Sequence, residues 1–199
     1  MYQLVLASES PRRKEILETS GFVFDVVPVK VSEIPDKNLN IDEQILDIAS
    51  RKANAGLVLV KSKLDGPFVL LAADTMVVYH DQTLGKPTNH DEAFKFLQLL
   101  SGNTHEVKTG MVLIESLGGK VLYHLETSRV TFRPLQDEEI WTYIQSGEPM
   151  DKAGAYAIQG LGKAFVEKFE GDFNNIVGLP VKIFESLLIN AGWQVRKFR

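Results

Sequence analysis

A serine- and arginine-rich stretch near the start of the sequence has the residue types of an anion-binding site. Leu6 to Arg13 has the sequence LASESPRR, and we predict that Ser10 caps a helix whose first residue is Pro11. Arg12 and Arg13 then add cations at the positive end of the helix dipole, which costs about 0.3–1 kcal/mol each when exposed. Free backbone amides and two guanidinium groups together suit a phosphate-rich anion. The alternative is a solvated basic turn with a serine cap.

Two more charged residues occupy positions where apolar side chains are expected. Lys52 lies at the centre of the apolar stripe of a helix predicted from Ile41 to Lys61, so it must extend to solvent or meet an anion. Asp74 follows Phe68–Ala73, a continuous apolar run typical of a strand covered on both faces. A buried carboxylate needs a cation, a donor or a metal. Asp74 is therefore a candidate functional residue, or else a structural cap of a neighbouring helix or loop.

Other polar residues have weaker signals. If Thr75 faces the same ligand as Asp74, the strand must end or bulge there, because successive side chains alternate. Pro87 restrains Lys86 to an extended conformation, which could hold its ammonium group over a cleft, although solvation is the commoner fate of a loop lysine. Arg51 is expected to be solvated, and His105 is expected to be structural. The glycine-rich stretch at 147–162 predicts an ordered functional loop.

The pattern of apolar residues predicts an α/β fold with a mixed sheet. Strands are expected at 4–7, 22–29, 68–79, 105–117, 120–132 and 164–169, and the fifth follows a hairpin turn at Gly118-Gly119. Helices are expected to begin at Pro11, near Ile41, after a cap at Asn89 or His90, at Gln136 and near Pro180. We expect Ile140, Trp141 and Ile144 to face inward, and the basic end at 196–199 to be a frayed surface tail.

Length and composition limit the class of protein. The 199 residues suit a single domain over 1–199, with room for two lobes around a cleft. A net charge of −4 argues against a general nucleic-acid or anionic-membrane surface. The absence of cysteine excludes disulfides, thiolate zinc sites and a cysteine nucleophile. With no signal-peptide pattern and no apolar stretch long enough to span a bilayer, a cytoplasmic protein is expected.

Several stretches, taken together and in order, resemble the Maf family of nucleotide pyrophosphatases, also called septum-formation inhibitors. They cover nearly the whole chain: Leu6 to Arg13, Ala73-Asp74-Thr75, Gly85-Lys86-Pro87, Ser101-Gly102 with His105, Glu148 to Tyr156, Gln159-Gly160 and Gly178-Leu179-Pro180. The resemblance implies metal-dependent hydrolysis of nucleoside triphosphates between the α- and β-phosphates. It also implies the inosine-triphosphate-pyrophosphatase-like (Maf/Ham1) fold, with two lobes around a central cleft, and a homodimer.

The resemblance assigns roles to individual residues. It places the general base or metal-binding aspartate at Asp74 and a further acidic, metal-binding position at Glu33, with Mg²⁺ or Mn²⁺ as the cation. The implied phosphate-binding residues are Ser8, Ser10, Arg13, Lys52 and Lys86. The implied positions that sort substrates are Arg12, Thr75 and Gln159, and this combination is similar to the dTTP/UTP branch. Phe173 departs from the tyrosine that the family pattern has after Asp172.

Two other functions remain open at this stage. The protein could be a pyrophosphatase that removes modified or noncanonical nucleotides from the pool. It could also be a non-enzymatic, nucleotide-binding regulator of septum formation and cell division. The acidic composition argues against direct DNA binding by such a regulator. Neither alternative predicts a nucleic-acid or membrane partner.

Overall fold

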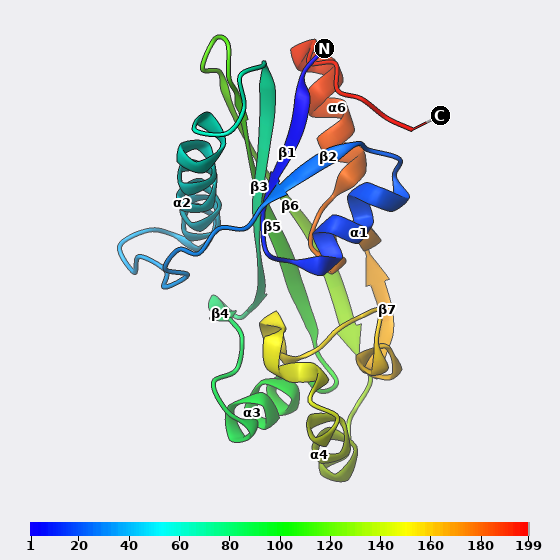
Figure 1. Ribbon diagram of the computed structural model, residues 1–199. Helices are drawn as coiled ribbons and strands as arrows, with labels where there is room; N and C mark the ends of the chain where they lie inside the picture. Colours follow the sequence, from blue (N-terminus) through cyan, green and yellow to red (C-terminus); the bar gives the residue numbers. More distant parts are fainter. Residues whose placement is uncertain (199) are drawn as a thin grey trace. The chain divides into compact units, whose positions relative to one another are not determined.

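The computed structural model describes residues 1–198 of the protein, and within them seven strands form one mixed sheet (Figure 1). The strand order is β2-β1-β3-β5-β6-β7, and β4 pairs with β3. Strand β1 is parallel to β2 and β3, whereas β4 is antiparallel to β3 and β7 is antiparallel to β6. The strands are β1 (Gln3–Ala7), β2 (Phe24–Val27), β3 (Phe68–Tyr79), β4 (Gln82–Leu84), β5 (Thr104–Glu115), β6 (Val121–Phe132) and β7 (Val166–Glu170). The predicted α/β class with a mixed sheet is confirmed.

Six α-helices accompany the sheet in the described residues. They are α1 (Pro11–Thr19), α2 (Ile41–Lys61), α3 (His90–Leu100), α4 (Asp137–Gln145), α5 (Phe173–Val177) and α6 (Val181–Ala191). Short 3-10 helices cover Glu148–Asp151, Ala153–Ala155 and Leu161–Phe165. None of the helices in residues 1–198 is both long and apolar enough to cross a membrane.

The chain divides into two compact units, which agrees with the predicted two lobes. Unit 1 comprises Met1–Asp74, Thr109–Glu126 and Gly178–Arg199, and unit 2 comprises Thr75–Lys108 and Thr127–Val177. The boundary between them falls inside β3, immediately after Asp74.

In unit 1, the chain winds in both directions from β1. Helix α1 leads from β1 to β2 on one side, and α2 leads from β2 to β3 on the other, so the two helices lie on opposite faces of the sheet (Figure 1). The face under α2 is an aliphatic core of Val5, Ala7, Leu70 and Ala72 from the strands with Ala49, Ala53 and Val60 from the helix. Gly56 permits the close approach of α2, because a Cβ there would lie 2.6 Å from that of Ala7.

Helix α1 begins where it was predicted to begin, and a glycine terminates it. Pro11 is its first residue and Ser10 its N-cap, although the Ser10 side chain makes no capping hydrogen bond. At the other end, Gly21 has φ of 78° and donates to the carbonyl of Glu18, while the amide of Phe22 donates to that of Leu17. This is the Schellman arrangement, in which glycine tolerates the left-handed backbone better than any other residue.

The core of unit 2 is aromatic. His105, Phe132, Tyr156 and Phe165 are buried with ring contacts among them, and the Nε2 of His105 is 2.8 Å from the hydroxyl of Tyr156. The structural role predicted for His105 is thus confirmed. In α4, Tyr143 is buried in place of the expected Trp141, which is 38% exposed.

Some expected boundaries and faces were wrong. The strand expected at 22–29 is limited to β2, and α5 was not predicted, because its five residues are too short to show a helical period. The final strand begins at Val166 after a 3-10 turn. Leu59, which a helical wheel places in the apolar stripe of α2, is 39% exposed.

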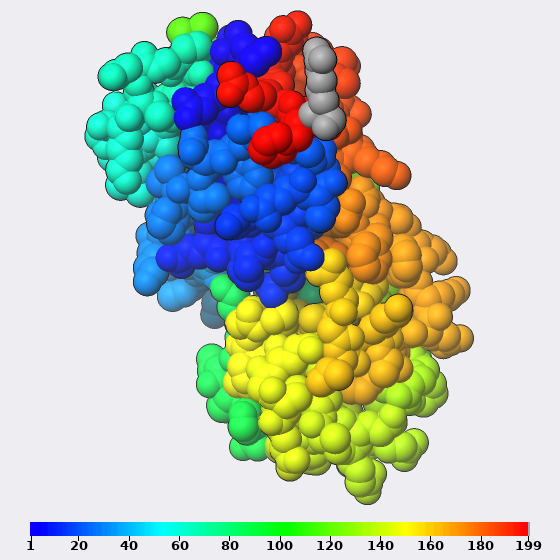
Figure 2. Space-filling model, turned by 45° about the vertical axis from the view of Figure 1, so that its right-hand side comes forward, coloured from blue at the N-terminus to red at the C-terminus, as the bar shows by residue number. Residues whose placement is uncertain are grey.

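The basic C-terminal segment is bound to unit 1 rather than frayed, as far as it is described. The amide of Tyr2 donates to Gln194, that of Val23 donates to Arg196, and that of Phe198 donates to Gly21. Figure 2 shows these first and last residues side by side on the surface of unit 1. Arg199, which the expected tail included, lies outside the described residues.

The buried His105 makes the free energy of unfolding depend on pH in the acidic range. Burial lowers the pKa of His105 to about 3 from an ordinary value of 6.5. Between these values the unfolded chain binds a proton that the folded chain does not, so stability is lost as the pH falls from 6.5 towards 3. We expect urea unfolding of the wild type to lose up to about 1.4 kcal/mol per pH unit relative to His105→Gln. His124→Gln, in which a partly exposed histidine of β6 is replaced, is the control. Equal pH dependence of the wild type and His105→Gln would contradict this assignment.

Candidate active site

The candidate site lies where the winding direction of unit 1 reverses. Leu6 of β1 pairs with Leu71 of β3, so Asp74 extends beyond the end of β1, after which Ser8 follows. In open α/β sheets, ligands bind outside the carboxyl ends of the strands at such a reversal. Strand β3 continues through Asp74 and Thr75. The strand therefore does not end at this point, and alternation directs these two side chains to opposite faces.

Lys52 is the centre of a charged cluster in unit 1. Its Nζ donates to Oδ1 of Asp74 at 2.6 Å and lies 2.6 Å from Oε1 of Glu33. The side chains of Lys52 and Asp74 are 9% and 10% exposed, whereas that of Glu33 is 43% exposed. Two carboxylates thus contact Lys52 within the apolar stripe of the helix. Of the two predicted alternatives for Lys52, contact with an anion is confirmed. The formal charges of one ammonium and two carboxylate groups give the cluster one net negative charge.

Arg13 extends this cluster with a buried guanidinium group. Its Nε donates to the carbonyl of Gly178 at 2.9 Å, and its Nη1 is 3.4 Å from Oγ of Ser8. Burial lowers the pKa of Arg13, and the charges of Asp74 and Glu33 oppose that shift. The same side chain is therefore desolvated and electrostatically coupled to both acids, as a group prepared for an anion would be.

The start of α1 lies beside Arg13. Oγ of Ser8 accepts from the amide of Ser10 at 3.1 Å, which shapes the turn into the helix. The Ser10 hydroxyl group, which was predicted to cap the helix, makes no capping hydrogen bond. Arg12 is half-buried on the first turn of α1. The structure thus brings together Ser8, Ser10 and Arg13 of the predicted phosphate-binding residues.

Arg51 does not have the solvated role expected for it. Its guanidinium group donates to the carbonyls of Ser32 and Ile34 and to the carboxylate of Asp47, and its side chain is 30% exposed. The two carbonyls flank Glu33, whose carboxylate meets Lys52. Arg51 therefore ties the loop that carries an acidic residue of the cluster to α2.

Thr75, Lys86 and Gln159 belong to unit 2. Thr75 is half-buried in β3, while Lys86 and Gln159 are exposed in loops. The loop of Lys86 is held within unit 2 because the amide of Gly154 donates to the carbonyl of Gly85 at 3.1 Å. The predicted glycine-rich loop is thus ordered and supports the backbone next to Lys86.

A second polar network holds the loop that carries Gln159. The Tyr143 hydroxyl donates to Oε1 of Glu148 at 2.9 Å, and this carboxylate accepts from the amides of Leu161 and Gly162 at 3.0 and 3.2 Å. Burial alone would raise the pKa of Glu148, but these three donors lower it. Gly160 leaves room for this carboxylate, since a Cβ at this position would lie 2.3 Å from Oε2 of Glu148 in its present position. The network fixes residues 160–162 immediately after Gln159.

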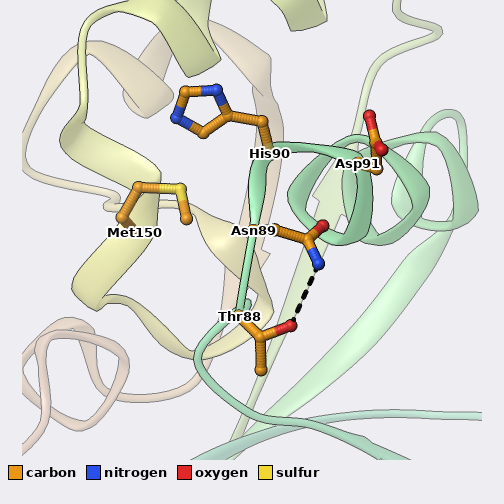
Figure 3. Close-up of a pocket in the computed structure, with 5 residues that line it drawn as sticks. All are labelled: Thr88, Asn89, His90, Asp91 and Met150. Atoms are coloured by element: carbon orange, nitrogen blue, oxygen red, sulfur yellow. Dashed lines mark hydrogen bonds between the residues drawn. The ribbon is translucent and has the colours of Figure 1, made fainter.

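A surface pocket of about 480 Å³ lies at the start of α3 in unit 2 (Figure 3). It is lined by Thr88, Asn89, His90, Asp91 and Met150. Asn89 has a structural role in this pocket: it is the N-cap of α3, and its side-chain oxygen accepts a hydrogen bond from the amide of Glu92 at 2.8 Å. None of the predicted site residues lines this pocket.

Glu33 and Asp74 are suitable partners for a hard divalent cation. Their oxygens converge on one cationic atom, Nζ of Lys52, so the chain already places two acidic groups around a positive charge. No group of three or more histidine or acidic side chains in residues 1–198 could hold a metal by itself. This donor set fits Mg²⁺, which is commonly held by one or two carboxylates with substrate phosphates and water completing its shell.

Sequence reasoning missed four residues that organise these networks: Arg51, Tyr143, Glu148 as an individual group, and Asn175. Asn175 is completely buried and donates to the carbonyl of Val107 and to Oγ of Ser128. All four bond to backbone groups distant in sequence, which no local pattern reports. For Glu148, the available sequence signal was the glycine-rich stretch that follows it, which predicts an ordered loop.

Comparison with known proteins gives consistent matches over nearly the whole chain. The family model described as Maf-like protein matches residues 3–191. A dTTP/UTP pyrophosphatase of Bdellovibrio bacteriovorus is 57% identical over 185 residues, which are 93% of this chain and 96% of that protein. Proteins of the same name from Caldicellulosiruptor bescii and Alkaliphilus oremlandii are 40% and 45% identical, covering 99% and 91% of this chain and 98% and 92% of their own.

Among solved structures, a match is a nucleoside-triphosphatase / dITP/XTP pyrophosphatase from Mycobacterium abscessus. It covers 95% of this chain and 93% of its own, with a TM-score of 0.38 and 12% identity. At that TM-score the likeness carries no argument about this chain.

Proposed function

Because the chain belongs to the Maf-like protein family, we propose that it is a nucleoside triphosphate pyrophosphatase that hydrolyses dTTP and UTP. The bond cleaved lies between the α- and β-phosphates, and the products are the nucleoside monophosphate and pyrophosphate. The observation that carries the proposal is the Glu33–Lys52–Asp74 cluster beside the buried Arg13. Relatives that share 40–57% of their residues with this chain have that activity in their names.

The proposed reaction is in-line attack of water on the α-phosphorus. Asp74 orients the water and accepts its proton, a new oxygen–phosphorus bond forms, and the bond to the bridging oxygen breaks as pyrophosphate leaves. Arg13 and Lys52 stabilise the negative charge that develops on the leaving group, and the α1 start and Ser8 bind phosphate oxygens. Lys86 has the phosphate-binding role that the family resemblance implies.

We propose Mg²⁺ or Mn²⁺ as the cation, with Glu33 and Asp74 as the protein groups that hold it. When bound, such an ion supplies charge neutralisation on the phosphate oxygens. Because Lys52 contacts both carboxylates at 2.6 Å, it keeps the two acids together before substrate arrives. Its ammonium group is then available to the phosphates that bring additional negative charge.

Base selection is assigned to Gln159 with Arg12 and Thr75. The amide of Gln159 can donate to O4 and accept from N3–H of thymine or uracil, but a flipped amide would suit cytosine equally. Arg12 only donates, so it favours a carbonyl edge and disfavours an amino group. The Glu148 network described above supports the backbone that follows Gln159. We further propose that the protein acts as a homodimer, as the family resemblance implies, and in the cytoplasm, as its sequence predicts.

The experiment that tests the function is pyrophosphate release over a panel of triphosphates with Mg²⁺. The panel comprises the common ribo- and deoxynucleotides together with base-methylated ones. Highest kcat/KM for dTTP and UTP is the expected result. A preference for methylated bases would favour removal of modified nucleotides, and a panel without turnover would favour the non-enzymatic regulator.

Gln159→Glu tests base reading. The new carboxylate cannot donate to O4 and repels it, so kcat/KM for dTTP and UTP should fall about 10-fold or more, whereas dCTP should be affected less. Gln98→Glu, which makes the same change on the exposed side of α3, is the matched control. An unchanged substrate profile in Gln159→Glu would remove this residue from base recognition.

A further inference from the structure

Glu33 lies in a segment with no regular secondary structure. Residues 28–36 form neither helix nor strand, and the chain re-enters regular structure at Asn40, which caps α2. The Glu33 side chain is 43% exposed, and its contact with Lys52 is therefore partly open to solvent. A partly exposed ion pair by itself contributes little to the order of a loop. Another interaction must hold the Glu33 backbone in place.

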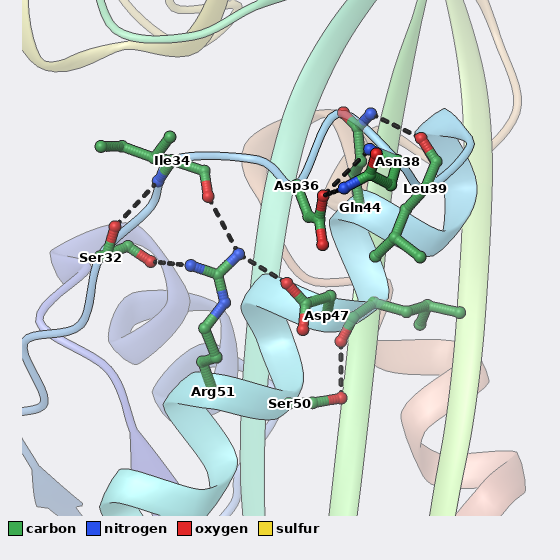
Figure 4. Close-up of polar contacts among 10 residues, drawn as sticks. Ser32, Ile34, Asp36, Asn38, Leu39, Gln44, Asp47, Ser50 and Arg51 are labelled. Atoms are coloured by element: carbon green, nitrogen blue, oxygen red, sulfur yellow. Dashed lines mark hydrogen bonds and ion pairs between the residues drawn. The ribbon is translucent and has the colours of Figure 1, made fainter.

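Arg51 supplies that interaction. Its Nη1 donates to the carbonyl of Ser32 at 2.6 Å and its Nη2 to that of Ile34 at 3.1 Å (Figure 4). Ser32 and Ile34 flank Glu33, so Arg51 holds the backbone on both sides of this residue, at the peptide group immediately before its Cα and at the carbonyl of the residue that follows it. The planar guanidinium group makes this a rigid two-point contact that an ammonium group could not reproduce.

The guanidinium group is itself oriented from one turn earlier in α2. Oδ2 of Asp47 accepts from Nη2 of Arg51 at 2.6 Å, and in Figure 4 both side chains extend from the helix towards the loop. The loop also has a bond of its own, because the Ile34 amide donates to Oγ of Ser32 at 3.4 Å. Asp47 and Arg51 thus form a clamp on the loop, which we call the Asp47–Arg51 clamp.

The clamp and the charged cluster share one rigid element. Arg51 and Lys52 are consecutive residues of α2, so the helix that carries the ammonium group of the cluster also fixes the backbone of the acid that meets it. We propose that Arg51 is a positioning residue that sets the Glu33 carboxylate against Lys52, and with it the geometry of the cation and phosphate site. Its catalytic consequence rests on the proposed function, whereas the clamp itself does not.

The activity test is a double-mutant cycle with dTTP and Mg²⁺. Arg51→Met should lower kcat/KM about 10-fold or more in the wild-type background, which is typical of groups that orient metal-binding residues, and raise the Mg²⁺ concentration for half-maximal rate. In the Glu33→Gln background the same change should cost less than about 2-fold, because the group it positions is gone. Arg51→Lys should recover only part of the loss. An equal cost in both backgrounds would overturn the positioning role.

A second test needs no substrate. Amide hydrogen exchange of residues 32–34 should become about 10-fold faster in Arg51→Met and faster also in Asp47→Asn, because the loop is no longer held by its two bound carbonyls. Arg129→Met is the matched control, since it removes an arginine of β6 that is paired with the carboxylate of Glu106. Unchanged exchange in Arg51→Met would overturn the clamp and leave the proposed function standing. A wild type that releases no pyrophosphate would instead overturn the proposed function, and the exchange test would still decide the clamp.

Discussion

Asp74→Asn should lower kcat for dTTP by at least about 100-fold, the usual contribution of a general base, while nucleotide binding persists. Asparagine has nearly the same shape as aspartate but cannot accept a proton from water. Because the Asp74 side chain is buried in β3 and contacts Lys52, bulk water cannot easily take over its role as proton acceptor. Lys52 would keep its contact with Glu33, so the anion-binding groups should remain in place. Pyrophosphate release and calorimetric binding of dTTP measure the two effects separately.

The control for this variant is Asp65→Asn, which makes the same change at an exposed turn. It should retain the wild-type rate. Near-normal hydrolysis by Asp74→Asn would reject Asp74 as the base. Loss of both turnover and binding would instead indicate that Asp74 organises the whole site.

Lys52→Met should be the most destabilising change in the cluster. It leaves the buried Asp74 carboxylate without its ammonium partner. Breaking a buried ion pair in this way typically lowers the free energy of unfolding by about 3–5 kcal/mol. We expect about 3 kcal/mol, at the lower end of this range, because the partly exposed Glu33 can be hydrated. Millimolar Mg²⁺ should restore part of this loss, since two carboxylates without the lysine are a better cation site. Urea unfolding with and without Mg²⁺ measures both effects.

Lys61→Met is a suitable control, because Lys61 is an exposed lysine at the end of the same helix. We expect it to change the free energy of unfolding by less than about 0.5 kcal/mol. An equally small change in Lys52→Met would show that the contacts of Lys52 do not stabilise the fold, and the proposed cluster would lose its structural role.

The sequence predicted the elements that have strong local signals. The helix start at Ser10-Pro11 and the long helix at 41–61 are observed, and the hairpin at Gly118-Gly119 connects β5 to β6. Lys52 could be singled out because a charge inside a regular apolar stripe needs a partner. The sequence could predict that this partner is an anion, but it could not identify Glu33 and Asp74, because both lie far from Lys52 in the chain.

The errors have a common physical cause. Arg51 was expected in solvent because a helical wheel places it at the rim, and a wheel contains no information about an irregular loop folded back over that rim. Trp141 was expected to face inward with Ile140 and Ile144, but it stacks on Phe94 of α3 while Tyr143 takes the buried position beside Glu148. The basic tail was expected to fray, but its backbone groups pair with those of Gly21 and Val23. In each case a long-range contact outweighed a local preference.

The central claim is that the charged residues of unit 1 serve water attack on the α-phosphorus of a pyrimidine triphosphate. The most direct test is turnover of dTTP in water enriched in heavy oxygen, followed by mass spectrometry of the products. The account predicts dTMP that carries the label and pyrophosphate that does not. Labelled pyrophosphate, or products consisting of dTDP and inorganic phosphate, would contradict it.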